Sequence, residues 1–329
     1  MGAGEIELQL LKQAARWPRG PVVFCVQRDE HYFLPHFFAH YRRLGVDGFL
    51  VYDDSSDAQA LAFLMRQPDC AVLRSQRQFG EIVGREPSGE PLRLGTAVKM
   101  RMPEELLAGR WVLTVDADEF LVLPSGVADL PQLIERLERA GQPYLTAPMV
   151  DFYGETLGHR RYGRDLDPFA GNPFFDAGPY YRWNDTIAPD RTLGGGVRLR
   201  LLAMLAKARP DLVAGIYGDH PIAPAKSWKA PLLKHGCGVV RHNDHELSVA
   251  PRPHFTAALA HFKFYPDLDD KIEQALARRQ YYNGSMEYAF LKAATETLGR
   301  ESLIAAQTRR YDGAASLEAA GLLGASAGS

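Results

Sequence analysis

Three absences in the 329-residue sequence narrow the kinds of protein that it can encode. It has only three cysteines, at positions 25, 70 and 237 and without CxxC spacing, which argues against a disulfide framework and favours a reducing compartment. The formal net charge of −2 gives no strongly basic field, so we expect no nucleic-acid partner. No apolar run reaches the roughly 18 residues of a membrane-spanning helix, so we expect a globular protein without a transmembrane segment.

The N-terminal sequence has neither the basic start nor the uninterrupted apolar segment of a signal peptide, so we expect a cytoplasmic protein. Residues 5–17 form an amphipathic stretch, for which a packed first helix is the favoured interpretation. The same stretch leaves a peripheral association with the inner membrane surface open. We therefore expect residues 1–20 to form an N-terminal helical segment.

Apolar runs typical of buried strands alternate with amphipathic segments typical of helices over the first 150 residues. Strands are expected at 21–27, 48–54, 70–75, 111–116 and 143–150, and helices near 33–44, 57–67, 96–109 and 129–141. Asp57 and Asp129 are the expected N-caps of the second and fourth helices. The alternation predicts an α/β fold with a mainly parallel sheet and helices on both faces.

Residues 152–196 are rich in glycine, proline and aromatic side chains. Such a segment fits either a surface that stacks on a sugar or nucleobase, or a second small core built from loops. Beyond it we expect strand-like runs at VRLRLLAML, PLLKHGCGVVRH and TAALAHFKFY, then helices at DLDDKIEQALARRQYY and MEYAFLKAATETLG. The expected organisation is a single domain over 21–312, with halves at 21–151 and 152–312, and a flexible tail at 313–329.

Acidic residues follow several of the predicted strands. Asp53 and Asp54 end the second strand, Asp116 and Asp118 follow the strand WVLTV, and Asp151 ends the next strand. In parallel α/β sheets the carboxyl ends of the strands converge, and ligands bind there. Two aspartates separated by one residue supply the hard oxygen ligands that Mn²⁺ or Mg²⁺ prefers, and such an ion stabilises a diphosphate leaving group.

Two stretches, VQRDEHYFLPHFFAHYRRLGVDGFLVYDDSSD and VLTVDADEFLV, resemble glycosyltransferase family 2, in the branch with a DxDEF motif. Further matching stretches are VDFYGE, GGVRLR, KAPLLK, ALAHFKF and QYYNGSMEYAF, which extend the resemblance over roughly residues 20–295. The resemblance implies a GT-A-like fold with a C-terminal strand and helix extension. It also implies metal-dependent, inverting transfer of a sugar from a nucleoside diphosphate, with UDP as the leading expectation, to a carbohydrate or lipid-linked acceptor.

The resemblance assigns roles to single residues. Matching residues of its first stretch are Arg28, Glu30, His40, Tyr41, Gly45 and Asp53, of which Arg28 and Glu30 are expected in the nucleotide-sugar site. Asp53 or Asp54 would contact the nucleoside, and the DDSSD spacing leaves open which of them does. Asp116 and Asp118 would contact the ribose and the metal, with Glu119 behind them.

The stretch AHFKF places His261 and Lys263 on one face of a predicted strand, because alternate residues of a strand point the same way. The spacing and the resemblance suit His261 as a third metal ligand and Lys263 as a phosphate contact. The alternative is a surface histidine and lysine on an edge strand. Lys229 is a further candidate for a phosphate contact.

The segment RHNDHE, residues 241–246, contains His242, Asp244, His245 and Glu246, which are potential zinc ligands. A polar loop is the favoured interpretation, because neighbours in an extended segment point in opposite directions and no HExxH register is present. His245 is then expected to contact the donor or the acceptor.

Glycosyl transfer also needs a base that takes the proton of the acceptor hydroxyl. Asp151 is the first candidate and Asp244 the second, with a structural role at a sheet end as the alternative for each. Two other classes of function stay open: a metal-dependent phosphoesterase that uses the same carboxylates, and a sugar-binding module without catalysis.

Overall fold

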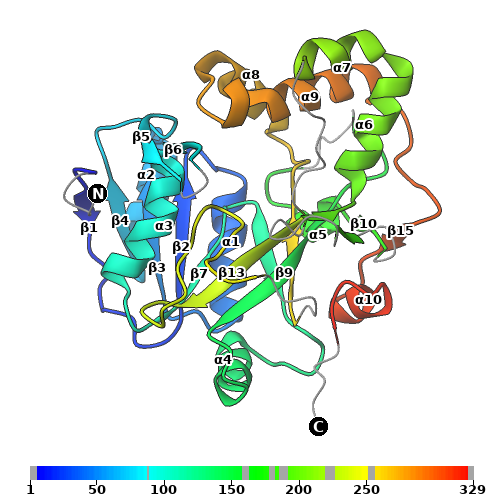
Figure 1. Cartoon of the computed structure of the whole chain (residues 1–329). Coiled ribbons are helices and arrows are strands. Elements are labelled where there is room, and N and C mark those ends of the chain that lie inside the picture. The colour runs from blue at the N-terminus through cyan, green and yellow to red at the C-terminus, as the bar shows by residue number, and fades with distance from the viewer. Residues whose placement is uncertain are drawn as a thin grey trace. The chain divides into compact units, whose positions relative to one another are not determined.

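The computed structural model describes residues 6–86, 89–157, 163–177, 182–184, 192–218, 227–250 and 256–324. It is an α/β protein with a large, mixed and mostly parallel central sheet, which confirms the predicted α/β class and the mainly parallel sheet (Figure 1). The chain divides into two compact units. Unit 1 comprises residues 1–147, 228–259 and 324–329, and unit 2 comprises residues 148–227 and 260–323.

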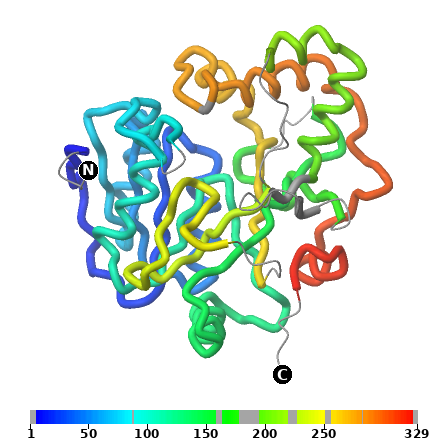
Figure 2. The backbone as a smooth tube through the Cα atoms, viewed as in Figure 1, coloured from blue at the N-terminus to red at the C-terminus, as the bar shows by residue number. Residues whose placement is uncertain are grey.

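The first boundary between the units lies close to the predicted division after residue 151. Residues 228–259 nevertheless return to unit 1, which the predicted halves did not anticipate. The reason is a long-range pairing: β13 (Trp228–Lys234) pairs antiparallel with β7 (Trp111–Thr114), beside strands from the first half of the chain (Figure 2).

The described part of the chain forms a nine-stranded sheet in the order β1-β4-β3-β2-β7-β13-β9-β14-β8. The other strands of this sheet are β1 (Gln9–Lys12), β4 (Cys70–Arg74), β3 (Gly48–Asp53), β2 (Val22–Gln27), β9 (Tyr144–Asp151), β14 (Ala258–His261) and β8 (Glu119–Val122). Strand β2 pairs parallel with both β3 and β7, and β3 pairs parallel with β4. The carboxyl ends of these parallel strands therefore lie along one edge of the sheet.

The helices of the described part of unit 1 are α1 (Phe33–Arg43), α2 (Ala58–Arg66), α3 (Leu94–Leu106) and α4 (Leu130–Arg139). The short strands β5 (Ile82–Arg85) and β6 (Pro91–Arg93) form a separate hairpin before α3. Helix α1 buries the apolar residues whose spacing predicted it, among them Phe37 and Tyr41. Asp57 and Asp129 are N-caps as predicted, because their side chains accept hydrogen bonds from the first free amides of α2 and α4.

Unit 2 contains the described elements of residues 148–227 and 260–323. They are α5 (Pro168–Gly171), β10 (Phe174–Asp176), β11 (Arg182–Asn184), β12 (Thr192–Gly194), α6 (Val197–Ala208), α7 (Pro210–Tyr217), α8 (Leu268–Arg278), α9 (Tyr282–Leu298), β15 (Thr308–Arg310) and α10 (Ala314–Ala319). Strand β10 pairs antiparallel with β15, and β11 pairs antiparallel with β12.

A buried aromatic cluster forms the core of unit 2. The ring of Phe152 lies 5.2 Å from that of Phe262 and 5.6 Å from that of Phe175, and all three side chains are fully buried. Phe169 stacks on Tyr311 beside them. The aromatic segment was predicted to form either a stacking surface for a sugar or nucleobase or a second small core. These rings form a second core. Residues 158–162, 178–181 and 185–191 of that segment lie outside the described residues.

Two predicted elements have the wrong type. Within the predicted N-terminal helical segment, residues 9–12 form strand β1, which pairs antiparallel with β4. The backbone groups of β4 provide this partner, so the sheet edge overrides the local amphipathic pattern. The run VRLRLLAML was expected as a strand but lies in helix α6, which buries Val197, Leu201 and Leu205 at four-residue spacing, the period of a helix.

The predicted flexible tail is also wrong for residues 313–324. This segment contains α10, and Leu317, Leu322 and Leu323 are buried. Burial of three leucines provides the hydrophobic free energy that holds a short helix in place.

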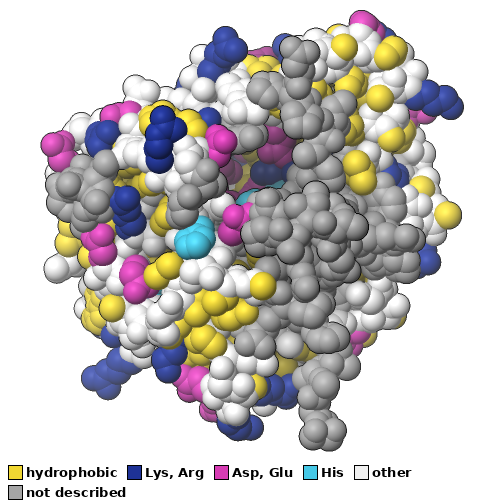
Figure 3. All heavy atoms as spheres, viewed as in Figure 1, with side chains coloured by type: hydrophobic (Ala, Val, Ile, Leu, Met, Phe, Trp, Pro, Cys, Tyr) yellow, Lys and Arg dark blue, Asp and Glu magenta, His cyan; other side chains and the backbone are white. Residues whose placement is uncertain are grey.

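Lysine and arginine side chains are interspersed with aspartate and glutamate on the face of the molecule in Figure 3. This mixture agrees with the formal net charge of −2. None of the described helices combines the length and the apolar character needed to cross a bilayer.

The buried position of Leu317 leads to the first testable prediction. Leu317→Ala should lower the free energy of unfolding by about 2–5 kcal/mol, because it removes buried methyl groups and leaves a cavity. Urea unfolding of the full chain measures the change. The matched control is Asp312→Ala, at an exposed position just before α10, which should change stability by less than about 0.5 kcal/mol. Equal stability of both variants with the wild type would mean that α10 does not pack.

Candidate functional site at the strand ends

The DxDE segment forms the connection between β7 and β8. Strand β7 ends at Thr114 and β8 begins at Glu119, so Asp116 and Asp118 lie in the short connection. The amide of Asp116 donates a hydrogen bond of 3.0 Å to Oε2 of Glu119, and the amide of Glu119 donates one of 3.1 Å to the carbonyl of Asp116. These two bonds close the turn and fix the direction of the Glu119 carboxylate.

Two buried lysines hold the carboxylate of Asp116. The Nζ atom of Lys99, from α3, lies 2.7 Å from Oδ1, and the Nζ atom of Lys229, from β13, lies 2.8 Å from Oδ2. Lys229 also donates to Oε1 of Glu119 over 2.5 Å, and Lys99 lies 3.1 Å from Oδ1 of Asp244. We call these five residues the lysine–carboxylate cluster of unit 1. The side chain of Asp116 retains 32% exposure, whereas Glu119 is fully buried.

The two ammonium groups offset the repulsion between the neighbouring carboxylates. Burial alone would raise the pKa of Asp116, but Lys229 and Lys99 outweigh it and hold the pKa well below its ordinary value. Burial would likewise lower the pKa of Lys99, but Asp116 and Asp244 raise it above its ordinary value. Asp116 and Lys99 are therefore both charged at neutral pH.

This cluster changes three of the predicted roles. Each oxygen of Asp116 faces an ammonium group, so a divalent cation placed between those oxygens would be repelled by two positive charges. Lys229 is occupied by internal carboxylates rather than exposed for a phosphate. Burial tends to raise the pKa of Asp244, but Lys99 lowers it below its ordinary value, which makes Asp244 a poor proton acceptor. Asp118 is partly exposed, as Asp116 is, and its metal contact stays a prediction.

The predicted nucleoside contacts lie at the ends of β2 and β3. Asp53 is fully buried, and it accepts hydrogen bonds from Nε2 of Gln27 at 2.6 Å and from Nε of Arg74 at 2.9 Å. Asp54 accepts one from Nη1 of Arg28 at 3.3 Å. Both oxygens of Asp53 serve the interior of unit 1, so the geometry favours Asp54 over Asp53 for the predicted nucleoside contact.

Asp54 is held at an energetic cost. Burial raises its pKa to about 6, even though Arg28 acts in the opposite direction. Glu30, in the connection from β2 to α1, is partly buried. Its amide donates a hydrogen bond of 3.5 Å to Oε1 of Gln27. Arg28, Glu30 and Asp54 therefore belong to the same strand-end region of unit 1.

The segment 241–246 is a polar turn. Oδ1 of Asn243 accepts hydrogen bonds from the amides of His245 and Glu246, both at 2.9 Å. Nδ1 of His245 lies 2.7 Å from the carbonyl of Trp228, which ties the turn to β13. Among the described residues, the possible zinc ligands of this segment do not form a group with metal-binding geometry. The contact of His245 with a donor or acceptor stays a prediction.

Asp151 and His261 lie in unit 2. Oδ1 of Asp151 is 2.6 Å from Nδ1 of His261, and Oδ2 accepts a hydrogen bond from Nε of Arg198 at 2.8 Å. Burial alone would raise the pKa of Asp151, but Arg198 and His261 lower it far below its ordinary value. These contacts argue against the predicted role of Asp151 as the catalytic base, since a carboxylate with both oxygens bound to such partners is a poor proton acceptor at neutral pH.

Lys263 follows His261 by two residues and is partly buried. Glu287, at the start of α9, is an acidic residue whose pKa is lowered by Lys263. Burial alone would raise the pKa of Glu287, but Lys263 and Arg198 lower it below its ordinary value. The predicted phosphate contact of Lys263 therefore has an anionic neighbour within unit 2.

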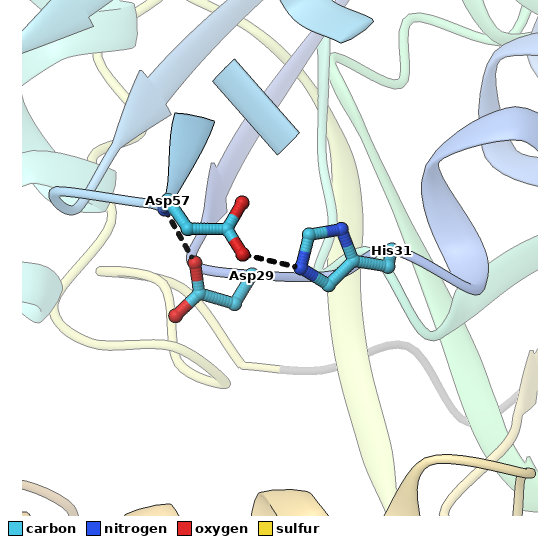
Figure 4. A group of neighbouring side chains, drawn as sticks. All are labelled: Asp29, His31 and Asp57. Carbon is cyan, nitrogen blue, oxygen red and sulfur yellow. Dashed lines mark hydrogen bonds and ion pairs between the residues drawn. The ribbon is translucent and has the colours of Figure 1, made fainter. Parts of the chain in front are cut away.

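A group of possible metal ligands lies at the start of α2 (Figure 4). The ligand atoms of Asp29, His31 and Asp57 lie within 4.8 Å of one another. Nε2 of His31 is 3.0 Å from Oδ2 of Asp57, and Oδ1 of Asp29 accepts a hydrogen bond of 2.7 Å from the amide of Asp57. Since Oδ1 of Asp57 also caps α2, these contacts already explain the arrangement as part of a helix start.

Sequence reasoning missed three charged residues that determine the geometry. Lys99 is a buried charge in the otherwise apolar stretch TAVKM of α3, and this isolated charge was the available signal. Arg198 and Glu287 stood inside stretches that carried the family resemblance, GGVRLR and NGSMEYAF, but they were not singled out.

The chain matches no protein-family model, and the search of curated proteins finds no match. The resemblance to glycosyltransferase family 2 therefore rests on the motifs of the sequence.

The raised pKa of Asp54 gives a prediction about pH. The unfolded chain ionises Asp54 near pH 3.8 and the folded chain near pH 6, so the folded state binds the extra proton between these values. Stability should fall as pH rises from about 4 to 6 and stay lower above that range. Asp54→Asn should remove this loss and raise the free energy of unfolding at pH 7.5 by up to about 3 kcal/mol.

Asp47 supplies a control of opposite sign. Hydrogen bonds from Arg16 and from the amide of Gly20 lower the pKa of Asp47 to about 2. Asp47→Asn should therefore lower the free energy of unfolding at pH 7.5, by about 1–2 kcal/mol. Urea unfolding at several pH values measures both variants. If Asp54→Asn destabilises the protein at pH 7.5, the conclusion that burial of the Asp54 carboxylate is unfavourable is refuted.

The lysine–carboxylate cluster gives a further prediction. Lys99→Met should lower the free energy of unfolding by about 3 kcal/mol at pH 7.5, because Asp116 and Asp244 lose a buried counter-charge. The loss should shrink at acid pH, as these carboxylates take up protons.

The matched control is Lys234→Met, which removes an exposed pair with Glu138 and should change stability by about 0–1 kcal/mol. Chemical unfolding at pH 7.5 and pH 4 compares the two variants. Indistinguishable losses for both would contradict the importance of the cluster.

Proposed function

We propose that the protein is a metal-dependent glycosyltransferase that moves a sugar from a nucleoside diphosphate, UDP being the first choice, to a carbohydrate or lipid-linked acceptor. The observation that carries the proposal is the gathering of Arg28, Asp54 and the DxD turn at the carboxyl ends of β2, β3 and β7. These strands are parallel neighbours, so their carboxyl ends lie side by side. Ligands of parallel α/β sheets bind at such an edge.

The residues of this edge would bind different parts of the donor, according to their surroundings. Asp54 and Arg28 would meet the nucleoside, since Asp53 is engaged inside unit 1. Asp116, held in place by Lys99 and Lys229, would accept hydrogen bonds from the ribose hydroxyls through its exposed part. Asp118 would bind the divalent ion, Mn²⁺ or Mg²⁺, because it offers a hard carboxylate oxygen.

The ion would stabilise the negative charge of the diphosphate as the bond to the sugar breaks. The chain itself would fix the donor in position. Rigid strand ends and the closed turn at 116–119 hold these side chains before any ligand arrives, which is what orientation of a donor requires.

The structure weakens the rival of a sugar-binding module that uses aromatic stacking. Three of the described rings of the aromatic segment, Phe152, Phe169 and Phe175, contact one another or neighbouring rings in the core of unit 2. Phe152 and Phe175 have no exposed surface to stack on a sugar. A phosphoesterase would use the same carboxylates and is separated from a transferase by its products.

The test is nucleotide-dependent thermal stabilisation. UDP, GDP and CDP are each added with and without Mn²⁺ to the wild-type protein and to Asp118→Ala. We expect Tm to rise with one nucleotide in the presence of Mn²⁺, because a ligand bound to the folded state stabilises it, and we expect Asp118→Ala to lose this rise. Asp312→Ala is the control and should retain it.

Three outcomes would contradict the proposal. Stabilisation by glycans without any effect of nucleotides would favour a binding module. Release of phosphate from simple esters without an acceptor would favour a phosphoesterase. A full effect of UDP and Mn²⁺ on Asp118→Ala would remove Asp118 from the metal site.

A further inference from the structure

Four side chains of unit 2, each with an ionisable group, form a continuous chain of hydrogen bonds. Nδ1 of His261, at the end of β14, lies 2.6 Å from Asp151, at the end of β9. Arg198, near the start of α6, donates to Asp151 over 2.8 Å and to Oε1 of Glu287 over 2.6 Å. His261 and Asp151 are each only 2% exposed, whereas the side chain of Glu287 is 43% exposed.

The backbone holds the first two members rigidly. The amide of Phe152, the residue after Asp151, donates a hydrogen bond of 2.9 Å to the carbonyl of His261. The imidazole and the carboxylate are therefore carried by two backbone segments that are bonded to each other. Side chains supported in this way keep their orientation better than side chains on an isolated loop.

The position of Asp151 decides the chemistry of the imidazole. A neutral histidine carries its proton on one ring nitrogen and its lone pair on the other, and a carboxylate next to Nδ1 favours the Nδ1–H form. The lone pair then lies on Nε2. Metal-binding histidines are commonly oriented by a carboxylate in this manner. Because Arg198 binds the second oxygen of Asp151, the carboxylate cannot turn away from the ring.

We propose that Asp151 is a positioning residue, which together with Arg198 holds His261 in the tautomer that offers Nε2 to a divalent cation. This inference rests on the proposed function, which requires a divalent cation. It replaces the predicted role of Asp151 as the base with a role that both of its hydrogen bonds support.

A second ion pair on the same helix shows what a purely structural pair looks like. Arg200, two residues after Arg198, binds Asp176 through Nε at 2.9 Å and through Nη2 at 3.0 Å. Asp176 is fully buried, and its further partner is the hydroxyl of Tyr153 at 2.7 Å. The two pairs share helix, residue types and burial, but only Asp151 contacts an imidazole. Asp176 is therefore the matched control.

The substitution Asp151→Asn tests the inference without removing any heavy atom. Arg198 can only donate hydrogen bonds, so the oxygen of the new amide should turn toward Arg198. The amide nitrogen then faces Nδ1 of His261, which has to accept a hydrogen bond instead of donating one. The ring should switch to the Nε2–H tautomer, and Nε2 should no longer bind a metal.

Two measurements follow the switch in the full chain. Nitrogen-15 NMR of labelled histidines reports the tautomer of His261 without any ligand, with His261→Ala to assign the signal. Electron paramagnetic resonance of Mn²⁺ in the presence of UDP reports metal affinity. We expect the Nδ1–H form in the wild type and the Nε2–H form in Asp151→Asn, with about 10–100-fold weaker Mn²⁺ binding.

Asp176→Asn should lose comparable stability but keep the wild-type tautomer, and its Mn²⁺ affinity should stay within about twofold, because a structural pair does not touch the imidazole. A wild-type ring already in the Nε2–H form would overturn the inference. So would unchanged Mn²⁺ affinity in Asp151→Asn when His261→Ala loses binding, and in that case the proposed function would survive. Failure of the wild type to bind Mn²⁺ with any of the three nucleotides would overturn both.

Discussion

The arrangement of the candidate site in unit 1 depends on the ion pairs of Asp116 with Lys99 and Lys229. Without them, the turn at 116–119 would place carboxylates close together in a largely buried region, which is electrostatically unfavourable. The lysines come from α3 and β13, two elements far apart in the sequence, so the same contacts also tie these elements to the end of β7. The acidic motif is thus neutralised by the protein itself and does not need a bound cation in order to fold.

In unit 2, Asp151 is also held by partners on both of its carboxylate oxygens. Asp151 lies between Arg198 and His261, as Asp116 lies between two lysines. In both places an aspartate is kept ionised by its partners, which suits a residue that holds other groups in position and does not suit one that takes up a proton. The identity of an aspartate at a strand end therefore says little about its role until its partners are known.

Asp54 shows the opposite balance in a comparable location. Burial outweighs its contact with Arg28, so its pKa is raised to about 6, whereas the pKa of Asp116 is lowered. A carboxyl group held at such a cost is typical of binding sites, where stability is given up for function. This contrast supports a nucleoside contact at Asp54 and a structural position for Asp53.

The sequence by itself determined what depends on near neighbours: the α/β alternation, the helix over Phe33–Arg43 and the caps at Asp57 and Asp129. Each of these is set by side-chain period or by a hydrogen bond within a few residues. Only the tertiary structure decided that β1 is a strand and that Lys99 and Lys229 meet at Asp116. An edge strand and an ion pair need partners that come from distant parts of the chain, and which partners arrive depends on how the elements pack.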